Sequence, residues 1–321
     1  MVLLAIWILK KSRTAEIAEG KSGKLEATKV SREPLIKSVP LRLTAYLFLL
    51  FGAFSIGILI SACIGLAIGG SHPLLAIGLA AFVLYVYLAV STLLFVLLVE
   101  RVKLADIGLP KAISYKQLGT GIFLAILFLL IEFGICTSAG WLKLVPNQVP
   151  EPYFVWLIVA CAIIGFTEEL IYRGYLLYVF EKWKGRTVAI ILTSILFWIP
   201  HISNGSEMPA LAAVGYLMFG VAQCFNRYAF GNLYFAIGFH AFYDLLALGT
   251  GQGGKEVPGY FNYLTNAPGW LLGPAGDTGL MDLLIPFGFL LLYSIWSYKK
   301  SLKADFAGVS NSAESRSIHG E

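Results

Sequence analysis

Apolar residues gather in eight long runs along the chain, and short polar, glycine-rich or proline-rich stretches separate these runs. The runs cover about residues 43–68, 74–99, 118–136, 153–180, 187–202, 209–225, 232–248 and 280–298. A membrane-spanning helix needs about 20 mainly apolar residues. The pattern therefore predicts an all-α fold, a polytopic transmembrane helix bundle of about eight spans, with no internal repeat and no second domain.

The composition agrees with a membrane protein and argues against a soluble one. Of the 321 residues, 58% are hydrophobic and 13% are charged, and the mean hydropathy is +0.76. Soluble domains carry about 25% charged residues. The net charge of +5 does not indicate a nucleic-acid partner, because the basic residues lie between the apolar runs. The four isolated cysteines, Cys63, Cys136, Cys161 and Cys224, are expected to be free thiols.

The positions of lysine and arginine predict the orientation of the bundle. With residues 1–42 as a cytoplasmic basic segment, the basic connections 99–117, 181–186 and 226–231 and the polar tail 301–321 all fall on the cytoplasmic side. The outer connections contain only Lys143 and Lys255. We therefore expect both termini in the cytoplasm and a transmembrane domain over residues 43–300. The apolar run 1–9 is too short to span and is expected to lie at the interface, and the long connection 249–279 is expected to be irregular.

The fourth run contains three charged residues where charge is costly. Glu168, Glu169 and Arg173 lie in "GFTEELIYRGYL", about 12 residues before the basic connection, which is roughly 18 Å of helix. An ionised side chain at the bilayer centre costs on the order of 3 kcal/mol and usually marks a site. Glu169 and Arg173 share a helix face and can pair, whereas Glu168 is rotated by about 100°. Glu168 is thus left as a carboxylate available for chemistry.

Two further apolar runs carry polar side chains at similar depth. His201 follows Pro200 at the end of the fifth run, and His240 and Asp244 share one helix face in the seventh. Glu132, Asp282 and Gln223 also occur in or near spans, but close to their ends, so we expect these three at the membrane interface.

The set Glu168, His201, His240 and Asp244 contains the groups that hydrolysis requires. A carboxylate removed from water is a better base near neutral pH, and a histidine can share the activation of water. A second histidine can stabilise an oxyanion. Glu168, His201 and His240 could equally hold a divalent metal such as Zn with one position open for water. The residues do not choose between a metal-bound and a glutamate-activated water.

These motifs resemble those of the CPBP intramembrane proteases, also called the CAAX protease and bacteriocin-processing (Abi) family. "EELIYR" matches the E-E-x-x-x-R motif, "FWIPH" resembles F-x-x-x-H, and "HAFYD" is similar to H-x-x-x-N or D. The resemblance covers about residues 150–250. It implies an intramembrane endopeptidase in which Glu168 and His201 activate water, His240 and Asp244 form the oxyanion site, and Glu169 and Arg173 hold the helix.

Asp244 departs from the asparagine that is frequent in this family. It could remain neutral and donate a hydrogen bond, orient a charged His240, or bind a metal, and we expect it to orient His240. The expected substrate is a membrane-associated peptide or protein, and the expected location is a bacterial cell (inner) membrane. The alternative functions are a non-catalytic scaffold or immunity protein on the same fold, or a transporter. A transporter is disfavoured because the polar residues are confined to spans four to seven.

Overall fold

The computed structural model of the protein describes residues 33–71, 73–149, 151–204, 206, 208–252, 258–273 and 278–319. The side chains of residues 151, 152, 203, 204 and 305–319 are outside this description. The expected interfacial segment 1–9 and most of the basic segment 1–42 lie outside the described residues.

Helices make up nearly all of the described chain and follow the eight predicted runs. The first half contains α2 (Val39–Ile68), α3 (Pro73–Phe95) with its π-helical extension η1 (Val96–Glu100), α4 (Tyr115–Ser138), α5 (Glu151–Glu169), the π-helix η2 (Leu170–Leu176) and α6 (Leu177–Lys184). The second half contains α7 (Arg186–Trp198), the 3₁₀ helix η3 (Ile199–Asn204), α8 (Pro209–Phe230), α9 (Tyr234–Gly249), α10 (Gly269–Leu272), α11 (Leu280–Asp282), the π-helix η4 (Leu283–Phe287) and α12 (Gly288–His319).

Six helices among the described residues are long and apolar enough to cross a membrane, and two apolar helices are shorter. The shorter two are Arg186–Ile202 and Tyr234–Gly249, which correspond to the fifth and seventh predicted runs. The predicted polytopic helix bundle is thus confirmed, and the protein is an integral membrane protein. The segment predicted as a polar tail, 301–321, continues α12 up to His319.

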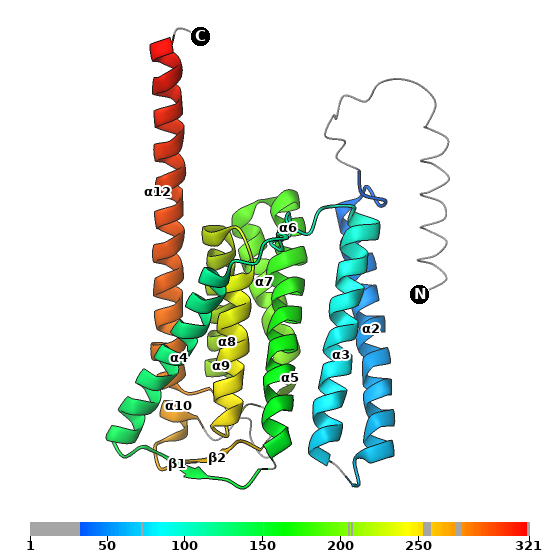
Figure 1. Ribbon diagram of the computed structural model, residues 1–321, viewed down its shortest axis with the longest axis vertical. Coiled ribbons are helices and arrows are strands. Elements are labelled where there is room, and N and C mark those ends of the chain that lie inside the picture. The colour runs from blue at the N-terminus through cyan, green and yellow to red at the C-terminus, as the bar shows by residue number, and fades with distance from the viewer. Residues whose placement is uncertain are drawn as a thin grey trace.

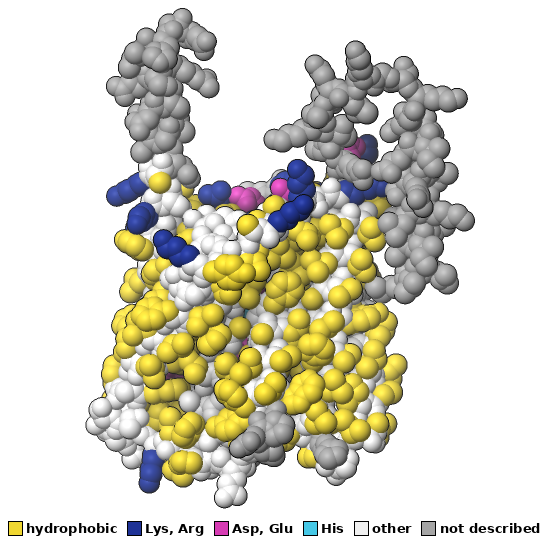
Figure 2. Space-filling model, viewed as in Figure 1, with side chains coloured by type: hydrophobic (Ala, Val, Ile, Leu, Met, Phe, Trp, Pro, Cys, Tyr) yellow, Lys and Arg dark blue, Asp and Glu magenta, His cyan; other side chains and the backbone are white. Residues whose placement is uncertain are grey.

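The helices run up and down, so their connections alternate between two ends of the bundle (Figure 1). Helices α2 and α3 form a hairpin on one side, and α5 lies between α3 and the remaining helices (Figure 1). Hydrophobic side chains cover the flank of the molecule, and most of the visible lysines and arginines gather at the end where α6 lies (Figure 2). The basic connections therefore share one end, as the sequence predicts. The cytoplasmic location of that end remains a prediction.

A small sheet lies at the opposite end and corrects the expectation that 249–279 is irregular. Strand β1 (Leu142–Pro146) pairs antiparallel with β2 (Phe261–Thr265), and Leu144 faces Tyr263 in the register. Asn147 Nδ2 donates a 3.0 Å hydrogen bond to the carbonyl oxygen of Gly259 next to this sheet. The strands escape sequence analysis because each is only five residues long and its partner lies far away along the chain.

Glycines allow α9 to approach the backbones of its two neighbours. A Cβ atom at Gly165 of α5 would lie 2.9 Å from the backbone nitrogen of Ala241 and 3.1 Å from its Cα. Gly121 of α4 and Gly238 of α9 similarly face backbone atoms of the opposing helix. Small residues at helix contacts in membranes permit close packing of this kind. The close contact at Gly165 places His240, the residue before Ala241, beside the carboxylates at the end of α5.

We expect Gly165→Ala to destabilise the protein, because the added methyl group meets backbone rather than a movable side chain. Overpacking of this kind costs about 1–3 kcal/mol. The matched control is Gly134→Ala, since Gly134 lies in α4 and a Cβ there has no neighbour within 4 Å. Thermal unfolding of the purified protein should show a lower midpoint for Gly165→Ala only. Equal midpoints for the two variants would contradict the close contact.

Candidate active site

The two adjacent glutamates lie where an α-helix changes into a π-helix. Helix α5 ends at Glu169, and η2 follows from Leu170 to Leu176. Glu168 lies midway along the candidate span Tyr153–Lys184. Short π-helical segments inside α-helices are frequent at functional sites. The local structure and the depth in the span thus agree with the sequence-based interpretation of this stretch.

The buried carboxylate of Glu169 contacts two side chains, those of Arg173 and His240. Its Oε1 atom accepts a 3.0 Å hydrogen bond from Arg173 Nη1 and lies 2.9 Å from Nδ1 of His240. The side chains of Glu169 and Arg173 are both fully buried. The guanidinium carbon of Arg173 also lies 4.3 Å from the centre of the Phe197 ring. The predicted pair is therefore present, and it includes His240 as a third member.

Glu168 keeps one carboxylate oxygen available. Its Oε1 atom accepts a 3.1 Å hydrogen bond from the hydroxyl of Tyr85, which lies on α3. Its Oε2 atom lies 3.8 Å from Nε2 of His240. Among the described residues, this buried Oε2 atom has no hydrogen-bond partner. The arrangement agrees with the sequence argument that Glu169 is neutralised and Glu168 is left for chemistry.

His201 lies in η3, directly after the end of α7, and its ring is held by the backbone. Its Nδ1 atom lies 2.7 Å from the carbonyl oxygen of Phe197, four residues earlier. A carbonyl oxygen only accepts hydrogen bonds, so Nδ1 carries the proton in this contact. In a neutral imidazole the other nitrogen, Nε2, is then the acceptor. Pro200 precedes His201, and the chain there has tightened from α-helix to 3₁₀ helix.

Asp244 lies one helical turn after His240, and its Oδ2 atom is 3.6 Å from Nε2 of His240. This separation is longer than a hydrogen bond. We expected Asp244 to orient the ring of His240. In the structure, Glu169 contacts Nδ1 of this ring, and Asp244 contributes a nearby carboxylate. Three carboxylates thus surround one imidazole.

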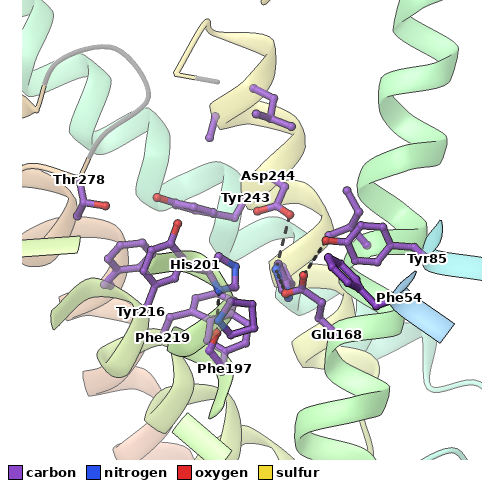
Figure 3. A pocket seen from close by; sticks show the side chains of 16 residues that line it. Phe54, Tyr85, Glu168, Phe197, His201, Tyr216, Phe219, Tyr243, Asp244 and Thr278 are labelled. Carbon is purple, nitrogen blue, oxygen red and sulfur yellow. Dashed lines mark hydrogen bonds and ion pairs between the residues drawn. The ribbon is translucent and has the colours of Figure 1, made fainter. Parts of the chain in front are cut away.

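All four predicted residues line a single cavity of about 410 Å³. In Figure 3 the labelled Glu168, His201 and Asp244 point toward the same space. The cavity also has aromatic walls, formed by Phe54, Tyr85, Phe197, Tyr216, Phe219, Tyr243 and Phe287. Its lining therefore includes residues of α2, α3 and η4, beyond the core at 150–250 that the sequence predicts.

The residues do not form a recognisable metal centre. Among the described residues, no group of three or more His, Cys, Asp or Glu side chains is arranged so that it could hold a metal ion. Glu169 also occupies Nδ1 of His240, and Phe197 occupies Nδ1 of His201. A metal held by Glu168, His201 and His240 stays a prediction.

Three polar residues lie elsewhere than the sequence indicated. Glu132, Asp282 and Gln223 were expected at the membrane interface, and all three are buried. Gln223 donates through Nε2 to the carbonyl oxygen of Ala236, and Asp282 Oδ2 accepts from the backbone N–H of Gly279. The expectation is wrong because neighbouring segments of the fold cover these positions, so a position near the end of a run is not necessarily exposed.

Several residues of the cavity are not marked by the sequence, among them Phe54 and Tyr85. Both lie in uniformly apolar spans, where an aromatic side chain is expected to pack against neighbouring helices. Only the contact between helices far apart in the sequence reveals their place beside Glu168.

The fold and the site together define a polytopic membrane protein with a buried carboxylate–histidine centre, and the comparison with family models agrees. Residues 150–246 match the family described as "Rce1-like: Type II CAAX prenyl endopeptidase Rce1-like". This family is the CPBP family, so the resemblance is confirmed over residues 150–246. The match supports an intramembrane endopeptidase in general. The comparisons with curated proteins and with solved structures gave no match.

We expect Glu169→Gln to destabilise the protein strongly, because it leaves the buried Arg173 without its counter-ion. Breaking a buried ion pair by removing one partner costs about 3–5 kcal/mol. The matched control is Glu181→Gln, because Glu181 pairs with Arg186 at 3.1 Å but both side chains are partly exposed. An exposed pair contributes about 0–1 kcal/mol. The two variants should differ clearly in thermal unfolding midpoint. Similar small shifts for both would show that Arg173 does not depend on Glu169.

Proposed function

We propose that this protein is an intramembrane endopeptidase that hydrolyses a peptide bond of a membrane-associated peptide or protein. The observation that carries the proposal is the meeting of Glu168, His201, His240 and Asp244 at one cavity, with Glu168 half-way along the candidate span Tyr153–Lys184. These residues come from α5, η3 and α9, and a purely structural ion pair would need only Glu169 and Arg173.

In this proposal, Glu168 and His201 activate the attacking water. Glu168 offers the unpartnered Oε2 atom, and His201 offers Nε2 because Nδ1 donates to the carbonyl oxygen of Phe197. The water oxygen attacks the carbonyl carbon of the peptide bond as its proton passes to this pair. The same proton then passes to the leaving amine, so the two groups act first as base and then as acid.

His240 stabilises the oxyanion that forms on the attacked carbonyl oxygen. Its Nδ1–H is directed to Glu169, and its Nε2 atom points toward Glu168 and Asp244, which both line the cavity. A ring that is protonated on both nitrogens would donate Nε2–H to the oxyanion. We assign to Asp244 the electrostatic support of this charged ring, at 3.6 Å from Nε2. Glu169 and Arg173 hold His240 and the helix in place.

We expect Glu168→Gln and His201→Ala each to lower cleavage of a membrane-embedded reporter peptide by about 10²–10⁴-fold, the usual contribution of general acid–base catalysis. The assay uses purified protein in proteoliposomes, with Glu181→Gln as a control that removes a carboxylate far from the cavity. If both site variants cleave as fast as wild type, the catalytic assignment is wrong. If wild type binds the reporter without cleaving it, a scaffold is the better interpretation.

Exhaustive chelation separates the two ways of activating water: a glutamate-activated water would keep its activity, whereas a metal-bound water would lose it. The measurement compares initial cleavage rates before and after dialysis against a strong chelator, and then after adding back Zn²⁺. A rate that falls to the level of Glu168→Gln and returns with Zn²⁺ would favour the metal-bound water instead.

A further inference from the structure

We infer that Tyr85 is a positioning residue that holds Glu168 in its reactive orientation, an inference that rests on the proposed function. Tyr85 lies on α3, outside the segment 150–246 that matches the family. Its hydroxyl donates a 3.1 Å hydrogen bond to Oε1 of Glu168, and its side chain lines the same cavity. In Figure 3, Tyr85 lies on the side of Glu168 that faces away from His201.

This contact engages one carboxylate oxygen and leaves the other free. With Oε1 bonded to the hydroxyl, Oε2 is directed toward the cavity and lies 3.8 Å from Nε2 of His240. A carboxylate has two equivalent oxygens and rotates broadly about its last torsion. A donor at one oxygen therefore selects the orientation in which the second oxygen meets the water. The hydroxyl does not need to touch the substrate for this effect.

The backbone of Tyr85 is itself fixed against α5. The hydroxyl of Thr167, the residue before Glu168, donates a 3.2 Å hydrogen bond to the carbonyl oxygen of Tyr85. Two hydrogen bonds thus join Tyr85 to α5. The side chain of Tyr85 bonds Glu168, and its backbone carbonyl oxygen bonds Thr167. The bond from Thr167 therefore keeps the backbone of Tyr85 next to α5.

A second attachment fixes α3 nearer the end of the bundle where α6 lies. Glu100, the last residue of η1, pairs with Arg42 at 3.2 Å and accepts a 3.4 Å hydrogen bond from the hydroxyl of Tyr175 in η2. The rings of Tyr46, Phe95 and Tyr175 pack edge-on or tilted beside this pair. Contacts at Tyr85 and at Glu100 therefore join α3 and its extension η1 to α5 and η2. These two contacts support the position of the Tyr85 hydroxyl.

The first test compares Tyr85→Phe with Tyr46→Phe in the cleavage assay. Tyr46 is a matched control because its hydroxyl is buried and bonds Thr92 at 2.9 Å in the same helix hairpin, but it does not line the cavity. We expect Tyr85→Phe to lower kcat by about tenfold to a hundredfold, the size expected for a hydrogen bond to a charged group, with KM within about twofold. Tyr46→Phe should leave both parameters near wild type. An unchanged kcat in Tyr85→Phe, while Glu168→Gln remains inactive, would overturn the inference and leave the proposed function intact.

The second test does not require catalytic turnover. It therefore tests the positioning role of Tyr85 separately from the proposed endopeptidase function. The infrared carboxylate bands of Glu168 are identified as those lost in Glu168→Gln, in protein labelled with ¹³C-glutamate. Removing a hydrogen-bond donor from one oxygen should shift these bands in Tyr85→Phe and leave them in place in Tyr46→Phe. Bands at the wild-type position in Tyr85→Phe would overturn the inference even if the wild-type protein cleaves no reporter.

Discussion

One buried carboxylate, that of Glu169, connects the ion pair with Arg173 to the histidines of the site. It accepts from Arg173 and lies within hydrogen-bond distance of His240, so it connects α5, η2 and α9 through a single oxygen atom. Arg173 in turn lies over the ring of Phe197, which carries the carbonyl that holds His201. Charges at this depth usually pair with one another. Thus, the pairing of one carboxylate also links both histidines.

The two histidines are fixed by different acceptors, and this difference separates their chemistry. A neutral carbonyl oxygen holds Nδ1 of His201, which favours an uncharged ring with a basic Nε2. A carboxylate holds Nδ1 of His240, and two further carboxylates lie within 3.8 Å of its Nε2 atom. Such surroundings favour an imidazolium that donates hydrogen bonds. His201 is therefore suited to accept a proton, and His240 is suited to stabilise negative charge.

The sequence predicts most of this protein wherever a local rule applies. Apolar length predicts the six long and two shorter apolar helices of the described residues, and the four-residue spacing of Glu169 and Arg173 predicts their pair. Two contacts and the burial of two polar residues depend on distant parts of the chain, so the sequence does not show them. The contact of Glu169 with His240 and of Tyr85 with Glu168 joins residues 71 and 83 positions apart. The burial of Glu132 and Asp282 depends on how neighbouring segments cover the ends of spans. The role of each site residue in catalysis stays a prediction.

The pairing of β1 with β2 also bears on the order in which the protein is made. Strand β1 precedes Glu168 and Glu169 in the chain, and β2 follows His240. Synthesis therefore delivers both carboxylates and both histidines before the second strand exists, and the sheet can close only afterwards. Segments η4 and α12 follow β2 in the chain, and α12 packs against α8. The nascent chain therefore carries all four reactive groups before the segments that complete the bundle have been made.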